Sequence, residues 1–366
     1  MTTVHAADLE DIARGAAVLG TGGGGDPYVG KLLARAAIEQ HGPVELIDAD
    51  DLAPDDLVIP TAAMGAPTVL VEKLPRGDEV SRAFERLQDR LGQRAAATMP
   101  IEAGGVNSML PFVVAARGRV PIVDADGMGR AFPELQMVTP TLDGISATPL
   151  ALADDKGNAV LLETIDNHWT ERFARSVTVD MGCSAMLAQY PMTGRQIAAS
   201  TIHGSLTLAR RIGAIIRSTR QAHSDVVAEV AAVTGGFVVF TGKVVDVGRR
   251  TERGFARGSA TVEGLDRHAE RRLQLDFQNE HLLARVDGEV VVSVPDLITV
   301  LDLETGEPVT TEGLRYGFRV AVLAIPSPAQ WRTEAGLRLV GPRYFGYDVD
   351  YIPVEHRLGT RRARMA

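Results

Sequence analysis

Residues 124–134, with the sequence DADGMGRAFPE, carry the densest group of side chains that could do chemistry. Asp124 and Asp126 are two positions apart, so on a turn both carboxylates can face one cation or one substrate. Arg130 can neutralise one of them or bind a substrate carboxylate through two parallel hydrogen bonds. We interpret these three as candidate catalytic residues. The alternative is a loop whose charges only neutralise one another.

Two glycine-rich segments, 20–27 and 102–108, are the next candidates. The first, GTGGGGDP, leads into a predicted helix, and free N–H groups at a helix start favour an anionic or strongly polar ligand. The second, EAGGVNS, joins an acid to paired glycines, and Glu102 is a candidate catalytic residue. The candidate substrate-binding residues are Gly22, Gly23, Gly24, Asp26 and Asn107. The alternatives are a flexible turn and, for Asn107, a helix cap.

Three side chains are candidate metal ligands: Cys183, Asp126 and His203. Cys183 is a candidate nucleophile or soft metal ligand, although buried, inert cysteines are the commoner case. His203 belongs to no metal-ligand spacing such as HExxH, so a packing or surface position is its alternative.

The N-terminal half alternates between helical and strand-like patterns, which indicates an α/β layer. Ligands of open α/β sheets gather at the carboxyl ends of the strands, where the loop after 121–124 should emerge. Helices are predicted at 8–19, 80–91 and 110–116, and strands at 44–47, 57–60, 68–71 and 121–124.

The C-terminal half is helix-rich over 195–233 and then becomes a series of short strands joined by Asp-Gly or other glycine turns. This series predicts a compact β-barrel or sandwich. Asn279 and Glu280 are candidate substrate-binding residues within it, or parts of an inter-strand turn. Because ligand pockets commonly lie between domains, we expect both to approach the N-terminal loops. Strands are predicted at 237–245, 260–262, 273–277, 282–286, 289–292, 298–301 and 319–325.

The length of 366 residues favours two domains, since single cores rarely grow beyond about 250 residues. The predicted fold class is α/β plus β. An α/β N-terminal domain is predicted over 1–170 and a C-terminal domain over 171–366. The latter would comprise a helical connection at 185–233 and a β-barrel at 236–350.

Charge and composition argue against several partners. The net charge is −9, so electrostatic attraction to nucleic acid is not expected. No apolar stretch is long enough to span a membrane. The single cysteine fits a reducing compartment, so we expect a cytoplasmic protein.

Seven strings spread over nearly the whole chain resemble the S-methyl thiohydantoin desulfurase family, which is associated with hydantoinase and oxoprolinase proteins. They are LGTGGGGDPY (19–28), MGAPTV (64–69), EAGGVNS (102–108), VDADGMGRAFPELQM (123–137), FQNEHLL (277–283), PDLITVLDLETG (295–306) and GPRYFGYD (341–348). The resemblance implies a Rossmann-like N-terminal domain and a C-terminal domain with a β-barrel.

The resemblance also implies hydrolysis of a hydantoin-like ring. Water would attack the ring carbon that bears sulfur, a carboxylate would take its proton, and methanethiol would leave. Asp124 or Asp126 would act as base or metal ligand, while Arg130 and the glycine-loop N–H groups would hold the ring oxygen. The resemblance implies no metal-ligand set, and zinc or another divalent metal bound by Cys183 beside them is a separate hypothesis.

Three classes of function remain open. The leading one is a hydrolase of this type, and the second is a noncatalytic ligand-binding or partner subunit of a hydantoinase-type enzyme. The third, a nucleotide-dependent enzyme, rests only on a glycine loop that matches neither common phosphate-binding spacing, so no nucleotide is expected. The expected partners are a small-molecule substrate, a hydantoinase-type protein and a second copy of the chain.

Overall fold

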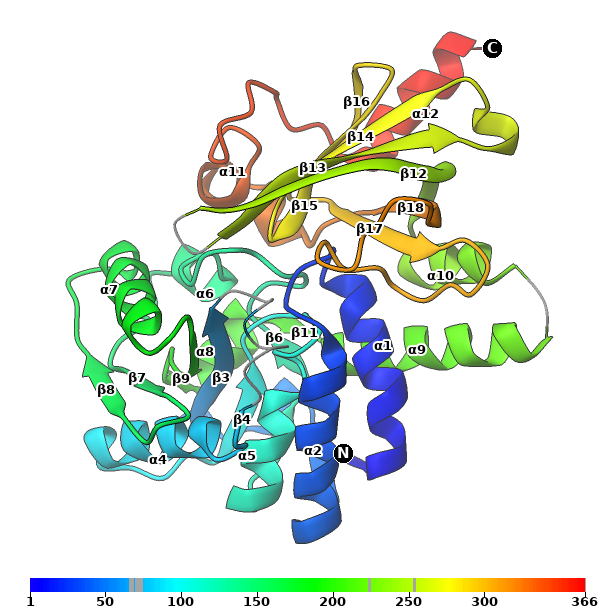
Figure 1. Ribbon diagram of the computed structural model, residues 1–366. Coiled ribbons are helices and arrows are strands. Elements are labelled where there is room, and N and C mark those ends of the chain that lie inside the picture. Colours follow the sequence, from blue (N-terminus) through cyan, green and yellow to red (C-terminus); the bar gives the residue numbers. More distant parts are fainter. Residues whose placement is uncertain (66–68, 70–74, 223–224, 253–254, 366) are drawn as a thin grey trace.

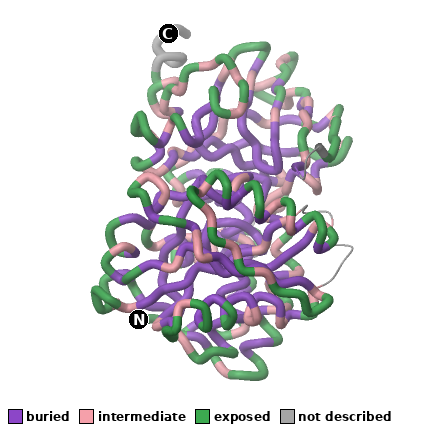
Figure 2. Tube along the Cα trace, turned by 90° about the vertical axis from the view of Figure 1, so that its left-hand side faces the viewer, coloured by how far each residue is buried: buried purple, intermediate pink, exposed green. Residues whose placement is uncertain are grey.

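The computed structural model describes residues 1–65, 69, 75–222, 225–252 and 255–365. A mixed α/β part is followed by a β-rich part (Figure 1), which confirms the coarse fold prediction. Buried residues run through the centre of both parts (Figure 2). The predicted strand at 68–71 lies outside the described residues, apart from residue 69.

The α/β part is built on one sheet, in which nine strands are described. Their order is β1-β2-β5-β4-β3-β9-β7-β8, and β10 also pairs with β3. Neighbours among β2, β5, β4 and β3 run parallel, whereas the pairs on either side are antiparallel. This topology does not confirm a Rossmann-like domain. The strands are β1 (Thr2–Val4), β2 (Val44–Ile47), β3 (Leu57–Gly65), β4 (Ala97–Pro100), β5 (Ile122–Val123), β7 (Leu150–Ala153), β8 (Ala159–Leu162), β9 (Ser184–Ala188) and β10 (Met192–Thr193).

Helices cover both faces of this sheet because its central strands are apolar on both faces. In β3, Leu57 and Ile59 belong to one hydrophobic core and Val58 to another, as expected when successive side chains point to opposite faces. The first core includes α1 (Leu9–Leu19), α2 (Pro27–His41), α4 (Glu79–Leu91), α5 (Leu110–Gly118), α9 (Ser205–Ala222) and α10 (Val226–Thr234). The second includes α6 (Thr139–Leu142), α7 (Asn167–Asp180), α8 (Gly194–Ser200) and α11 (Glu334–Val340).

The β-rich part is one antiparallel sheet in which seven strands are described, in the order β16-β15-β14-β13-β12-β18-β17. A closed barrel requires the two end strands to pair. β16 and β17 do not pair within the described residues, so the sheet curls without closing, and the predicted β-barrel is corrected to a half-barrel. The strands are β12 (Phe237–Glu252), β13 (Phe255–Gly264), β14 (Arg272–Gln278), β15 (Glu280–Val286), β16 (Glu289–Ser293), β17 (Leu297–Asp302) and β18 (Arg319–Ile325), followed by the C-terminal helix α12 (Val354–Met365).

Strands beyond residue 170 still join the first sheet, while the domain boundary at 170/171 stays a prediction. β9 pairs with β3 and β7, so the chain still belongs to the first sheet at Ala188. Strand β11 (Ile202–His203) then pairs with the earlier β6 (Ala125–Asp126) in a two-stranded sheet, and the second sheet begins only at Phe237. The predicted helical connection at 185–233 therefore also contains strands. Apolar periodicity identifies a strand, but not the sheet that it joins.

Helices α1 and α9 cross at backbone contact, because each presents a glycine to the other. A Cβ atom at Gly15 would lie 1.8 Å from the Ala209 carbonyl oxygen, and one at Gly213 would lie 1.9 Å from the Asp11 oxygen. Leu19, at the end of α1, lies in the same core as Leu301 and Leu323 of the second sheet. The crossing therefore helps to fix the two parts together. None of the helices described is long and apolar enough to cross a membrane.

We expect Gly15→Ala to lower the free energy of unfolding by about 1–3 kcal/mol, because overpacking forces backbones apart. Gly118→Ala is the matched control, since a Cβ there meets only Val120, at 3.8 Å. Urea denaturation measures both variants. Equal stability of the two would contradict the crossing described above.

Candidate active site

Three chain segments meet where the two parts join: the glycine loop 20–25, the segment 102–108 after β4, and residues 279–281 at the start of β15. A Cβ at Gly23 would lie 2.0 Å from Glu280 Oε1, and one at Gly24 would lie 2.6 Å from the Gly104 Cα. The Val106 N–H donates to the Gly24 carbonyl oxygen at 2.8 Å. The glycines therefore allow the three segments to pack closely around the carboxyl group of Glu280.

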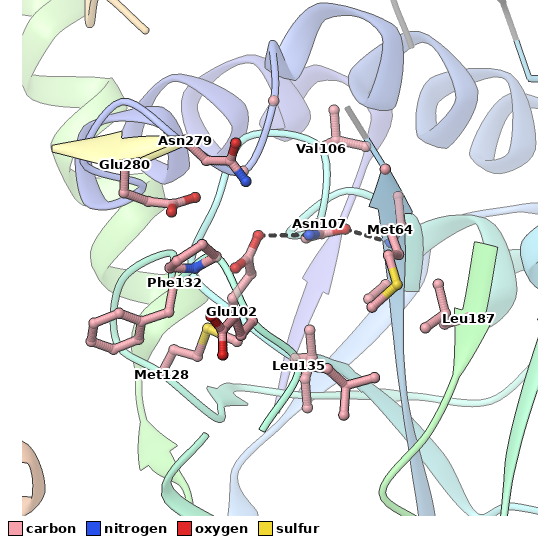
Figure 3. A pocket seen from close by; sticks show the side chains of 18 of the residues that line it. Met64, Glu102, Val106, Asn107, Met128, Phe132, Leu135, Leu187, Asn279 and Glu280 are labelled. Atoms are coloured by element: carbon pink, nitrogen blue, oxygen red, sulfur yellow. Dashed lines mark hydrogen bonds between the residues drawn. The ribbon is translucent and has the colours of Figure 1, made fainter. Parts of the chain in front are cut away.

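A pocket of about 710 Å³, open solvent at its mouth included, lies at this junction (Figure 3). Five predicted site residues line it: Gly24, Glu102, Asn107, Asn279 and Glu280. The expectation that Asn279 and Glu280 approach the N-terminal loops is thus confirmed. Much of the remaining wall is apolar, with Met64, Ile101, Val106, Met128, Phe132, Leu135 and Leu187.

Glu102 is a buried acid held by a fixed amide. Asn107 Nδ2 donates to Glu102 Oε1 at 2.6 Å, and the Ala63 N–H donates to Asn107 Oδ1 at 2.6 Å. This second bond orients the amide so that its NH2 group faces the carboxylate. Burial raises the pKa of Glu102 to about 7, although the hydrogen bond from Asn107 lowers it. Glu102 can therefore exchange a proton near neutral pH.

Glu280 is the second buried acid and comes from the other sheet. Asn279 precedes it in the left-handed region, with φ +57°, and Asn279 Oδ1 accepts from the Ala256 N–H at 2.8 Å. Glu280 Oε2 has no hydrogen-bond partner among the described residues. Burial, followed by the charge of Glu102, raises the pKa of Glu280 well above its ordinary value. Figure 3 shows the two carboxyl groups pointing toward one another.

Asp124 and Asp126, predicted as catalytic residues, are bound to the backbone of their own chain. Asp124 Oδ1 accepts from the N–H groups of Leu206 and Thr207, at the start of α9, at 2.8 and 3.2 Å. Asp126 Oδ2 accepts three backbone N–H groups at 2.6–3.0 Å, including those of Met128 and Gly129. Burial raises the pKa of Asp126 to about 6, and these bonds lower it. Neither side chain lines the pocket, and each binds backbone N–H groups of neighbouring segments.

Arg130 is fully buried and joins the two parts. Its guanidinium donates to the carbonyl oxygens of Pro295, Asp296 and His281 and to Thr21 Oγ1, at 2.9–3.2 Å. Burial lowers the pKa of Arg130 to about 10, so the group stays charged at neutral pH. Arg130 does not line the pocket, but its charge lowers the pKa of Glu102 and Glu280.

The other predicted substrate-binding residues lie around the pocket without lining it. Asp26 accepts from the Tyr28 N–H at 2.8 Å and caps α2, in which Pro27 takes the first position. Gly22 and Gly23 pack against His281 and Glu280. The carboxylate of Asp26 thus occupies the helix end at which an anionic ligand was expected.

Two of the predicted metal ligands, Asp126 and His203, lie on the paired strands β6 and β11, where Asp126 is opposite Ile202. Cys183 lies in the left-handed turn after α7, with φ +63°. His203 is exposed in β11, and Asp126 is buried and bonded to the backbone. Among the residues described, no three His, Cys, Asp or Glu side chains could jointly hold a metal ion. The metal site stays a prediction, and we derive no step through a metal.

Sequence reasoning missed Gln189, Glu134 and Arg175 as lining residues. Glu134 belongs to the polar segment 124–134 and could have been found there. Gln189 follows the apolar strand β9, and Arg175 lies within helix α7, so neither stands in a polar motif. Only the tertiary fold brings them to the junction.

The fold and the pocket define a protein of two parts, α/β and β, with a carboxyl-lined pocket between them. Family models match both parts: the S-Me-THD-like N-terminal domain over residues 7–164 and the S-Me-THD-like C-terminal domain over residues 165–354. The chain therefore belongs to the S-methyl thiohydantoin desulfurase-like family, as its sequence motifs predict.

A solved structure supports the fold. The chain is similar to a protein from Chromobacterium violaceum solved by X-ray crystallography, with a TM-score of 0.82 and 24% sequence identity. The similarity covers 97% of this chain and 100% of that chain, so the two share the whole fold. Comparison with the curated proteins gives no match.

We expect Arg130→Met to lower the free energy of unfolding by about 3 kcal/mol or more, because it leaves several buried oxygens without a donor. The matched control is Arg319→Met, which removes an exposed pair with Glu304 and should cost less than about 1 kcal/mol. Urea denaturation of both variants tests this. A cost at Arg130 no larger than at Arg319 would refute the joining role.

Proposed function

We propose that the pocket is the active site of a hydrolase that acts on a hydantoin-like ring, in the manner of an S-methyl thiohydantoin desulfurase. The observation that carries the proposal is the buried pair of Glu102, in the segment after β4, and Glu280, at the start of β15, which line the same pocket. Membership of the S-Me-THD-like family supports the choice of ring.

The raised pKa values suit the two acids to opposite roles. Glu102, with a pKa of about 7, is partly ionised at neutral pH and is suited to act as base. Burial also raises the pKa of Glu280, which favours its protonated form and suits it to act as acid. Two titratable groups whose environments separate their pKa values are typical of acid–base catalysis. The base role therefore passes from Asp124 or Asp126, the sequence-based candidates, to Glu102.

Each proton of the reaction has a place in this scheme. Glu102 takes a proton from water as the water oxygen bonds to the ring carbon that bears sulfur, and Glu280 protonates the adjacent ring nitrogen. The carbon–sulfur bond then breaks, and the sulfur leaves as methanethiol with the proton from Glu102. The hydroxyl proton of the adduct returns to Glu280 as the ring carbonyl forms. One water is consumed, and both acids regain their starting states.

The charges around the pocket favour an uncharged substrate. Among the described residues, Glu102, Glu134 and Glu280 line it together with one cation, Arg175, which is already paired with Glu171. A phosphate-bearing ligand would meet this acidic lining, which argues against the nucleotide-dependent alternative. A small neutral heterocycle would bury its ring against the apolar wall. We expect the reaction to take place in the cytoplasm.

We expect Glu102→Gln and Glu280→Gln each to lower kcat for S-methyl thiohydantoins at least 100-fold, since each removes a proton-transfer group. In the unaltered protein, kcat/KM should rise as the pH increases through about 7, because Glu102 must lose its proton to act as base. Methanethiol release, measured with a thiol reagent, gives the rates. Mass spectrometry in ¹⁸O-labelled water should show one ¹⁸O atom in the hydantoin.

Glu263→Gln is the matched control, since its side chain is half exposed and lies in β13. It should leave the rate unchanged. Tight binding of hydantoins without turnover would contradict the hydrolase proposal and favour the noncatalytic partner subunit. Full activity of either pocket variant would contradict the assigned roles.

A further inference from the structure

Gln189 stands on a rigid segment of the pocket wall. Its N–H donates to the Pro60 carbonyl oxygen, and the next residue, Tyr190, donates to the Ala147 carbonyl oxygen, both at 3.1 Å. Tyr190 is fully buried and has φ +48°, so the chain turns sharply after β9. The backbone of Gln189 is thus fixed on both sides. Its side chain is 3% exposed and lines the pocket.

The carboxamide of Gln189 lacks the partner that a buried amide normally has. Its Oε1 accepts no hydrogen bond from any described residue. By contrast, the buried Gln88 accepts from the Ala95 N–H at 2.8 Å through the same atom. A buried amide oxygen without a donor is unfavourable, so such groups call for an explanation. A ligand in the pocket would supply the missing donor.

We propose that Gln189 is a specificity-determining residue that recognises one edge of the substrate ring, an inference that rests on the proposed function. An amide group presents an acceptor and a donor side by side. A hydantoin-like ring presents the matching pair, an N–H next to a carbonyl group. Gln189 Oε1 accepts from the ring N–H, and its Nε2 donates to the ring oxygen.

This assignment separates recognition from chemistry within one pocket. Glu102 and Glu280 belong to the junction of the two sheets, whereas Gln189 follows β9. A site built to hydrogen-bond an N–H group rejects analogues that lack it, because its own polar group is then left unpaired. Methylation of the ring nitrogen next to the carbonyl should therefore weaken binding.

The test is calorimetric titration of 5-methylhydantoin and of its analogue methylated on N3, the ring nitrogen that is next to the carbonyl group in the S-methyl thiohydantoin. The unaltered protein should bind the parent ring at least 10-fold more tightly. Gln189→Met keeps the size of the side chain but removes both polar atoms, and it should bind the two rings within about twofold of each other. Gln88→Met, which removes a buried glutamine outside the pocket lining, should keep the full preference.

The outcomes separate the two proposals. A preference that persists in Gln189→Met, or that is absent from the unaltered protein while it still turns over S-methyl thiohydantoins, overturns the role of Gln189 alone. If the unaltered protein neither binds nor converts any such ring, the proposed function fails and the role of Gln189 fails with it. Absence of the preference from the unaltered protein overturns the role of Gln189 even if Gln189→Met does not fold.

Discussion

The cost of burying two carboxyl groups beside one another is the constraint on which the rest of the site depends. Glu102 and Glu280 are 4% and 2% exposed. The charge of Glu102 raises the pKa of Glu280, and the charge of Asp126 raises the pKa of Glu102. They lie so deep because glycines let three segments close around them; a side chain at Gly23 would take the space of Glu280. Ionising both acids there is unfavourable, so burial favours the protonated form of each.

This burial links stability to pH. A carboxyl group whose pKa is raised by folding stabilises the folded state fully below its ordinary pKa, and this contribution is lost as the pH rises through the folded value. For Glu102 that interval runs from about 4.5 to about 7. Arg130 moderates the loss, because its charge lowers the pKa of both pocket acids while its hydrogen bonds hold the two parts together. Arg130 therefore affects both the position of the two parts and the proton affinity of the two pocket acids.

The helices, strands and motifs could be predicted from the sequence, but the closure of the second sheet and the contacts of the polar side chains could not. Strands of the second sheet were predictable from short apolar runs, whereas barrel closure depends on whether β16 meets β17. Asp124 and Glu102 both stand beside glycines in polar segments. Asp124 nevertheless caps α9, a helix about 80 residues further along the chain. The pattern of side chains could not predict this, because the donors are backbone N–H groups. Gln189 follows an apolar strand, and only the packing of the sheet reveals it as part of the site.

Titration of the two pocket acids tests the central claim most directly. Carbon NMR of protein labelled at the glutamate carboxyl carbons follows each group, and the spectra of Glu102→Gln and Glu280→Gln assign the two signals. We predict a midpoint near pH 7 for Glu102 and one well above the ordinary value for Glu280. If both groups titrate near 4.5, as exposed glutamates do, the pocket holds two ordinary solvated carboxylates and the account of an acid–base pair is contradicted.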